Sequence, residues 1–279
     1  MGRTFPKESS EYRSARNALL KREVALRKEM ESVAAERRAL PPGPAVSDHY
    51  LFDAWDSDGK LIKVRLSELF RQGSDTLLFY HYMFPRNSED ERPRMAGASV
   101  AELPREDGPC PSCTLLLDQW DCVLPYLEGA DTSFATVTKA PIERVMAFAR
   151  DRGWRNVTLV SAANNSFKRD FHGEDETGEQ EPLMTVFHRD KDGTIRLSWA
   201  SELLFEPLME PDQDPRHLGT VEPFWGFLDL TPRGRPKTDR YRDHAHCDPG
   251  KAAPPQAIAK SETESVSPAN IAAAQHQCD

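Results

Sequence analysis

Apolar residues near the start of the chain recur at helical spacing. Residues 7–40 contain neither Gly nor Pro and are rich in Ala, Leu, Glu, Lys and Arg, which favours a long helix. Spacings of three, four and seven residues put one apolar stripe on this helix: Tyr12, Ala15, Leu19, Leu26, Met30 and Val33. The PPGP segment at 41–44 ends the helix. We expect this arm either to lie over its own domain or to pair with a second copy of the chain.

From residue 45 onward, the apolar pattern predicts strands that alternate with helices. Two hairpins are expected, 49–55 with 61–66 and 183–188 with 194–199, because each pair of segments flanks a turn that contains Gly. The almost unbroken apolar run 76–84 suits a central strand covered on both faces. Further strands are expected at 132–138 and 156–161, helices from 114 to about 127 and over 141–150, and a last apolar element at 223–228. Such alternation predicts a parallel α/β core.

A CxxC sequence, Cys110-Pro111-Ser112-Cys113, follows a long charged loop at 85–109 and directly precedes the helix expected from residue 114. A parallel β-α-β unit followed by an antiparallel hairpin is the thioredoxin plan, in which a CxxC lies after a central strand at a helix N-terminus. The predicted fold class is therefore α/β, a thioredoxin-like fold with a central mixed sheet flanked by helices. We expect an N-terminal helical arm (1–44), a thioredoxin-like domain (45–235) and a flexible tail (236–279) that is poor in large apolar residues.

Composition narrows the classes of function. The net charge of −9 argues against general nucleic-acid affinity and against docking on an anionic membrane surface. No apolar run approaches the roughly 18 residues of a membrane span, and the N-terminus has no apolar signal region, so we expect a cytoplasmic protein. Five cysteines, an odd number, do not suggest a disulfide framework. Outside the CxxC pair, Cys247 and Cys278 lie in the tail, and Cys122 is expected in the core.

The CxxC pair has the residue types that thiol chemistry needs. A cysteine attacks as its thiolate, of which an ordinary thiol with a pKa of about 8.5 forms little at neutral pH. A helix N-terminus favours negative charge, so Cys110 is the predicted attacking thiol, with Pro111 presetting the first helical turn. Cys113 lies three residues on, on the same face of that turn, and can close a disulfide with Cys110.

We predict a substrate pocket that is lined by Pro111, Ser112, His172 and Pro182. His172 precedes a polar loop and is either an exposed histidine or a base or metal ligand that faces the CxxC. Pro182 precedes the strand expected from 183, where thioredoxin folds commonly have a cis-proline that faces the CxxC. His81 lies within the central strand and is expected to be a core histidine.

Four segments together resemble a known family: residues 78–84, 110–113, 170–172 and 228–235. Over roughly residues 10–236 the chain is similar to the thioredoxin-like family known as domain of unknown function 899, which is related to peroxiredoxin-like and thioredoxin-like proteins. The resemblance implies a thioredoxin fold with an N-terminal helical extension. Pro109 stands where a thioredoxin has a tryptophan before its CxxC, which argues against a general protein disulfide reductase.

The leading hypothesis is a thiol-disulfide or peroxide-handling oxidoreductase that uses Cys110 and Cys113 on a small-molecule or protein thiol or disulfide, without a cofactor. A metal-binding protein is an alternative, because Cys110, Cys113 and His172 offer thiolate and imidazole ligands for copper or zinc. A small-molecule biosynthetic enzyme on the same scaffold is another alternative. The last alternative is a binding or scaffold protein that works through the N-terminal helix, which can also pair with a second copy to form a homodimer. No nucleic-acid or membrane partner is expected.

Overall fold

The computed structural model describes residues 3–203, 218 and 221–235. The predicted flexible tail at 236–279, with Cys247 and Cys278, lies outside these described residues. Seven strands form one sheet: β1 (Leu51–Trp55), β2 (Leu61–Arg65), β3 (Thr76–His81), β4 (Thr132–Thr138), β5 (Leu159–Ser161), β6 (Leu183–Arg189) and β7 (Ile195–Ala200). Their spatial order is β2-β1-β5-β4-β3-β6-β7. Both predicted hairpins are present, as β1–β2 and β6–β7.

The middle of the sheet is parallel and its flanks are antiparallel. β4 pairs in parallel with both β3 and β5, whereas β1 and β6 join the sheet in antiparallel orientation. β3 is hydrogen-bonded along its whole length on both sides, to β4 and to β6, so it is the central strand that its apolar run predicts. Strand, helix and hairpin follow one another in the predicted order, and the thioredoxin-like fold is confirmed.

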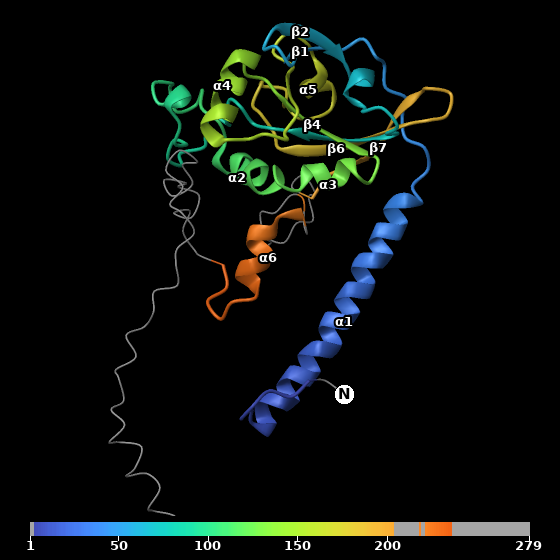
Figure 1. Cartoon of the computed structure of the whole chain (residues 1–279), viewed down its shortest axis with the longest axis vertical. Coiled ribbons are helices and arrows are strands. Elements are labelled where there is room, and N and C mark those ends of the chain that lie inside the picture. The colour runs from blue at the N-terminus through green and yellow to red at the C-terminus, as the bar shows by residue number, and fades with distance from the viewer. Residues whose placement is uncertain (1–2, 204–217, 219–220, 236–279) are drawn as a thin grey trace, which may run out of the picture.

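Helices cover both faces of this sheet (Figure 1). The helices are α1 (Ser10–Arg38), α2 (Pro111–Trp120), α3 (Leu124–Glu128), α4 (Ile142–Arg152), α5 (Phe167–Asp170) and α6 (Pro223–Asp229), with 3₁₀ turns η1 (Leu66–Leu69) and η2 (Ala98–Val100). Figure 1 shows α2 and α3 on one side of the sheet and α5 on the other. Residues of α2 and α4 share one buried cluster, whereas η1 and α5 contribute to a second.

Successive side chains of β3 pack alternately into these two buried clusters. Leu77 and Phe79 pack in the cluster with Phe167 of α5, while Tyr80 packs in the cluster with Leu117 of α2. Successive side chains of a strand point to opposite faces, so a run that is apolar at every position is buried on both sides. This burial fixes the end of β3, beyond which the chain reaches the CxxC.

The helix after the CxxC is shorter than the sequence analysis predicts. Instead of running to about residue 127, α2 ends at Trp120, and α3 begins at Leu124. Pro125 lies in the first turn of α3, and a proline has no N–H to continue the hydrogen bonds of a preceding helix. Cys122 therefore lies in the turn between the two helices and is exposed, so the prediction of a core cysteine is wrong.

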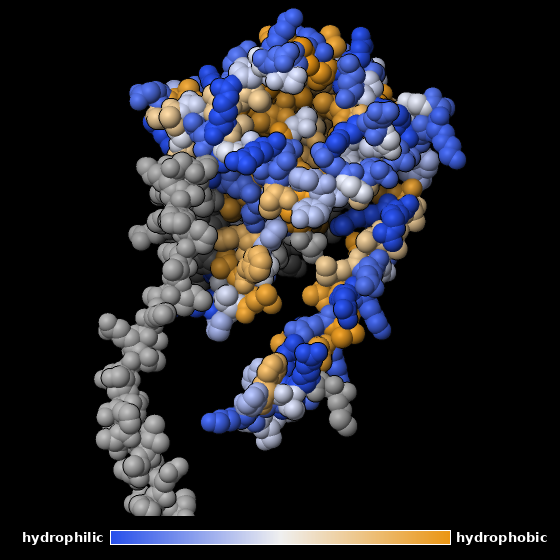
Figure 2. Space-filling model, in the orientation of Figure 1, coloured by the Kyte–Doolittle hydropathy of each residue, from blue (hydrophilic) through white to orange (hydrophobic). Residues whose placement is uncertain are grey.

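The N-terminal arm is one long helix, as predicted, and its end is fastened to the sheet. None of the residues of α1 is buried, and the helix projects from the domain (Figure 1). Figure 2 shows hydrophobic residues on it between hydrophilic ones. The segment that follows α1 in the sequence runs along β7, where the N–H of Leu197 donates to the carbonyl of Pro44 over 3.1 Å. At Gly43 a side chain would overlap the Leu197 backbone, so this close approach requires glycine.

Candidate functional site

The two thiols of the CxxC lie at the first turn of α2, beyond the end of β3. Cys110 is the N-cap of α2 and Pro111 is at its first position, as the sequence predicts. The N–H of Cys110 donates to the carbonyl of Met83 over 2.9 Å, which ties the start of the helix to the chain that leaves β3. Both thiols are free, and their residues are only 2% exposed at Cys110 and 1% exposed at Cys113. The site is a buried dithiol.

A charged loop covers this dithiol and places a cation on it. Nη2 of Arg92 donates to Sγ of Cys110 over 3.4 Å, and Nη1 donates to Oγ of Ser112 over 2.6 Å. The carboxylate of Asp90 accepts from Nε and Nη2 of the same guanidinium, each over 2.6 Å. A two-pronged carboxylate contact fixes the plane of an arginine, so Asp90 aims Arg92 at the sulfur.

Arg86 holds the loop in this shape from within. The residue is 2% exposed, and its guanidinium donates to the carbonyls of Pro109 and Arg92, each over 2.9 Å. It also lies 3.8 Å from the carboxylate of Asp90. A buried arginine that satisfies several carbonyl groups joins the start of the loop to Arg92 in its middle and to its last residue, Pro109.

The surroundings shift the pKa values of the two thiols in opposite directions. The pKa of Cys110 falls to about 6, because the Cys113 thiol donates to it and the Arg92 charge and the Cys113 N–H add to this effect, outweighing burial. The pKa of Cys113 rises well above its usual value, because the thiol is buried and donates to Cys110. At neutral pH, Cys110 is thus a thiolate beside a guanidinium, and Cys113 is a thiol.

Arg92 remains charged in this environment. Burial alone would lower the pKa of its guanidinium, but the hydrogen bonds and charges of Asp90 and Cys110 raise it above the usual value. The arrangement is therefore an ion pair of thiolate and guanidinium that is largely withdrawn from water, where a charged hydrogen bond is stronger than at the surface.

A polar chain supports the start of α2 from the side of β3. The hydroxyls of Tyr82 and Thr114 lie 2.8 Å apart, and the Thr114 hydroxyl also lies 2.8 Å from the carbonyl of Cys110, to which it donates. Burial raises the pKa of Tyr82 well above its usual value, so its hydroxyl keeps its proton. These contacts hold the Cys110 backbone, while Arg92 holds its sulfur.

The other residues predicted to line the pocket do not all lie beside the CxxC. Ser112 contacts Arg92, but the side chain of His172 is exposed, and its backbone φ is 56°. Pro182 directly precedes β6, whose first residue Leu183 pairs with His81 at the end of β3, so it lies at the edge of the sheet where β3 ends. Among the described residues the cis peptide bond is Phe84–Pro85, and the expectation of a cis bond at Pro182 is wrong.

The residues predicted as metal ligands are not gathered into one cluster. Within the described parts of the chain, no group of three or more His, Cys, Asp and Glu side chains is placed to hold a metal ion. Cys110 and Cys113 are buried, whereas His172 is exposed on the loop after α5. Cys110 thus has the guanidinium of Arg92, and not an imidazole, as its charged neighbour.

Sequence reasoning missed Arg86, Asp90 and Arg92. The only signal for them is their position in a charged loop directly before the CxxC, and nothing in the periodicity of that loop distinguishes these residues from Arg94 or Glu91. A search for charged side chains that compensate a cysteine at a helix start would have had to consider the whole loop, because loop residues reach a site through tertiary contacts and not through regular spacing.

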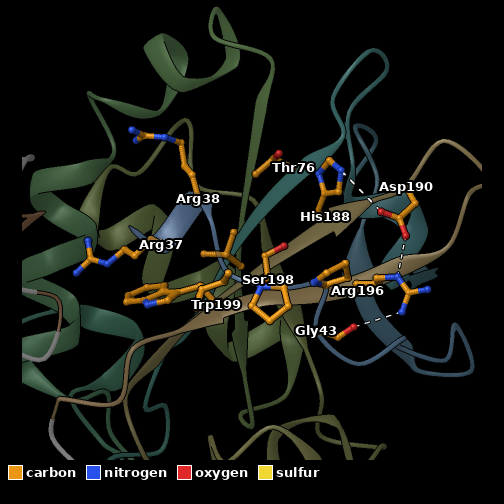
Figure 3. Close-up of a pocket in the computed structure, with 13 residues that line it drawn as sticks. Arg37, Arg38, Gly43, Thr76, His188, Asp190, Arg196, Ser198 and Trp199 are labelled. Atoms are coloured by element: carbon orange, nitrogen blue, oxygen red, sulfur yellow. Dashed lines mark hydrogen bonds and ion pairs between the residues drawn. The ribbon is translucent and has the colours of Figure 1, made fainter. Parts of the chain in front are cut away.

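A separate pocket lies near the fastened end of α1 (Figure 3). It has a volume of about 500 Å³, and Arg37, His188, Arg196 and Trp199 are among its walls. Its charges are largely occupied: Arg196 pairs with Asp190 over 2.7 Å, and the Arg37 guanidinium lies 5.1 Å from the centre of the Trp199 ring. His188 pairs with the first residue of β3, so the whole length of that strand separates this pocket from the dithiol.

These features define a thioredoxin-fold protein with a buried dithiol at the first turn of α2. Residues 2–248 match the family described as bacterial protein of unknown function (DUF899), and the chain belongs to that family. The predicted resemblance is thereby confirmed. No curated protein matches the sequence. Within the described residues, no helix is both long enough and apolar enough to cross a membrane.

Solved structures of low identity share parts of the fold. Peroxidoxin BcpB from Mycobacterium tuberculosis is 18% identical with a TM-score of 0.36, over 56% of this chain and 82% of its own. AhpC from Enterococcus faecalis is 15% identical with a TM-score of 0.39, over 57% of this chain and 78% of its own. Reduced Prx3 from Vibrio vulnificus, in complex with hydrogen peroxide, is 11% identical with a TM-score of 0.38, over 63% and 91%.

Proposed function

We propose that this protein is a cysteine-based oxidoreductase in which Cys110 reduces a small hydroperoxide and Cys113 closes a disulfide with it. The observation that carries this proposal is the hydrogen bond of 3.4 Å from Arg92 to Sγ of Cys110. It supports a thiolate at neutral pH, because the pKa of Cys110 lies at about 6. A thiolate, and not a thiol, is the nucleophile in such reactions.

Burial of the dithiol favours a small oxidant over a protein. With Cys110 only 2% exposed, a disulfide on the surface of another protein has no access to its sulfur without movement of the covering loop. A peroxide is small and is polarised by a hydrogen-bond donor. The Arg92 guanidinium can stabilise negative charge as it develops on the leaving oxygen. Proline in place of tryptophan at position 109 also argues against a general disulfide reductase.

The proposed reaction has two steps. In the first, the Cys110 thiolate attacks one peroxide oxygen; the S–O bond forms, the O–O bond breaks, and the leaving oxygen takes a proton to give alcohol or water. In the second, Cys113 attacks the resulting sulfenic acid; the S–S bond forms and water leaves. An external dithiol returns the pair to the reduced state by exchange. The chemistry is assigned to the two thiols without a metal, which a metal analysis of the purified protein tests.

The test is mass analysis of the intact full chain after treatment with hydrogen peroxide. The wild type is expected to form the Cys110–Cys113 disulfide, Cys113→Ser to accumulate sulfenic acid on Cys110, and Cys110→Ser to remain reduced at Cys113. Cys122→Ser is the matched control, since that thiol is exposed and its hydrogen bond is to the carbonyl of Gln119. Peroxide consumption by Cys110→Ser at the wild-type rate would contradict the proposal. So would stoichiometric bound copper or zinc that is lost when His172 is replaced.

We further infer that α1 pairs with α1 of a second copy. A helix of 29 residues without buried side chains gains little stability from its own domain, and isolated helices are only marginally stable in water. Its stripe is openly exposed, with Leu26 61% accessible. Solution mass of the full chain should show a dimer that Leu19→Lys with Leu26→Lys dissociates. Asn17→Lys, on the opposite face of α1, is the control, and a monomeric wild type would refute the pairing.

We infer a cytoplasmic location, because the proposed dithiol cycle depends on a compartment in which thiols are returned to the reduced state. Fractionation of the native host tests this location, and recovery of the protein with Cys110 and Cys113 fully oxidised outside the cytoplasm would contradict it.

A further inference from the structure

One face of the sheet carries a row of apolar side chains that are only half-buried. Leu78 of β3, Val186 of β6 and Trp199 of β7 are aligned across neighbouring strands, so their side chains share one face. The next aligned pair toward the end of β3, Tyr80 and Met184, is buried on that same face. We call Leu78, Val186 and Trp199 the open row, because all three remain half-buried among the described residues.

The open row lines a groove of about 600 Å³ between the sheet and α1. Met30 and Val33 of α1 and, from much later in the chain, Leu218 and Val221 are among its other walls. Figure 1 shows α1 and α6 on the side of the sheet that carries α2 and α3. The groove meets the pocket of Figure 3 at Trp199. Apolar surface is therefore accessible both on the sheet and on the helix that faces it.

The apolar stripe of α1 continues beyond this groove toward the N-terminus. Tyr12, Leu19 and Leu26 lie on that part of the helix, and all three are exposed. A helix rises about 1.5 Å per residue, so Tyr12 lies about 32 Å from Val33 along the same helix. Tyr12 therefore cannot fill the groove of its own copy. Each copy has an apolar groove at one end of α1 and an unburied apolar stripe at the other.

The stripe has a symmetric spacing, which decides how two such helices can meet. Its members are separated by 3, 4, 7, 4 and 3 residues: Tyr12, Ala15, Leu19, Leu26, Met30 and Val33. About a twofold axis between positions 22 and 23, two antiparallel helices place the first member opposite the last, the second opposite the fifth and the third opposite the fourth. Every apolar member then faces an apolar member, as a self-complementary twofold interface requires.

The charged residues on this face of α1 fit the same antiparallel register. Arg22 and Glu23 fill the gap at the centre of the stripe, three or four residues from its neighbouring members. In this register, Arg22 lies opposite Glu23 of the partner subunit, and Arg16 lies opposite Glu29 of the partner subunit. Within one copy, Arg16 also pairs with Glu23 over 2.9 Å. Complementary charges beside an apolar seam set the orientation of paired helices.

We propose that a second copy of this chain closes the groove: the two α1 helices pair antiparallel about an axis between positions 22 and 23, and the N-terminal half of each covers the open row of the other. Tyr12 of the partner subunit then lies beside Val33, at the groove. The inference rests on the proposed pairing of α1, and it adds the direction, the register and a second surface that is buried. Removal of both apolar surfaces from water drives the association.

Two full-length variants test the direction and the register. Tyr12→Glu and Val33→Lys each place two charges in apolar layers of the homodimer, so each alone should raise the dimer dissociation constant at least about tenfold. Mixed one to one, they should recover dimer, because one layer then holds opposite charges and the other is unchanged. Tyr12→Glu mixed with Leu26→Lys is the matched control, since these positions are not opposite, and it should stay monomeric. Sedimentation equilibrium measures all four samples, and circular dichroism verifies that each variant folds.

Photocross-linking tests what covers the groove. Benzoylphenylalanine replaces Tyr12 in the full chain, and light and heavy isotope-labelled copies are mixed so that links between copies can be recognised. Links between copies, from position 12 to Val33 or to the strands that carry the open row, are expected. The same probe at Asn17, on the opposite face of α1, should give few such links.

The outcomes separate this inference from the proposals on which it rests. A dimer that the mixed variants do not restore, or links from position 12 to position 12, would overturn the antiparallel register and leave the pairing of α1 standing. Links confined to one copy would show that another segment of the same chain covers the groove, which also overturns it. A monomeric wild type would refute both the pairing and the register. The reaction of Cys110 with peroxide is measured separately and decides neither.

Discussion

Nη2 of Arg92 lies 3.4 Å from Sγ of Cys110, and this contact joins a loop residue to a helix cap 18 positions away in the sequence. The sulfur already lies at a helix N-terminus, where free N–H groups favour an anion. Arg92 adds a full positive charge that Asp90 holds in place. Backbone and side chain therefore act together on one atom, and their contributions can be separated by substitution.

Replacing Arg92 with Met should raise the pKa of Cys110. The variant removes the guanidinium charge and the hydrogen bond but leaves the helix N-terminus and Cys113 unchanged. An opposite charge at this range typically shifts a pKa by about 1–3 units, so the Cys110 pKa should move from about 6 toward its ordinary value. Ultraviolet thiolate absorbance against pH measures the shift. Arg94→Met is the control, because Arg94 is exposed and donates to the Ala101 carbonyl in this loop, away from Cys110 in sequence.

The oxidation rate of Cys110 by hydrogen peroxide should rise with pH through about 6 and be level above it. The sign follows from the thiolate: below its pKa the sulfur is protonated and unreactive, and above it the nucleophile is fully formed. Stopped-flow fluorescence or quenched mass analysis gives the profile. In Arg92→Met the midpoint should move up with the thiol pKa, and an identical midpoint in both proteins would show that another group controls the rate.

Much of the fold was predictable because its signals are local. The apolar run of β3 and the turn residues between β6 and β7 each specify one element within a few residues. The break between α2 and α3 was missed although its signal, Pro125, is in the sequence. That misjudged break also misplaced Cys122, because a helix continued through residue 122 turns the thiol inward.

The candidate site was only half predictable. Position at a strand end and a helix start identified Cys110 and Cys113. Arg92 was not predictable because a charged residue in sequence is normally a solvated one, and its contact with Cys110 depends on how loop 85–109 packs on the start of α2. His172 had the right chemistry in sequence, but its side chain is exposed in the structure.

Asp118 should be important for stability because it joins α2 to α4. Its carboxylate accepts from Nε and Nη2 of Arg152, whose side chain is 3% exposed, and from Nε1 of Trp154 over 2.8 Å. Asp118→Ala leaves the Arg152 charge buried without its partner, which should cost about 3 kcal/mol of unfolding free energy. Asp118→Asn keeps an acceptor and should cost less.

Urea denaturation of the three proteins measures these differences. Glu143→Ala on the exposed face of α4 is the control and should change the unfolding free energy by less than about 0.5 kcal/mol. Equal losses for Asp118→Ala and Asp118→Asn would show that the charge, and not the accepted hydrogen bonds, holds the two helices together.

Gly173 packs directly on the ring of His81, and this close approach should make Gly173→Ala destabilising. A Cβ there would lie 2.9 Å from Cγ of His81 and closer still to Nδ1. His81 cannot move aside, because it is fully buried, stacks on Phe167 with ring centres 5.6 Å apart, and bonds through Nε2 to the Thr185 hydroxyl over 3.2 Å. Overpacking of this kind typically costs about 1–3 kcal/mol.

A double-mutant cycle distinguishes the steric cause from a loss of backbone freedom. The Gly173→Ala penalty in urea denaturation should shrink by at least about 1 kcal/mol in a His81→Ala background, because the residues that collide are then no longer both present. Gly129→Ala is the control; its added Cβ would meet no atom closer than 3.5 Å, and it should be nearly neutral. A penalty that is the same in both backgrounds would mean that the backbone at Gly173, and not the histidine ring, requires glycine.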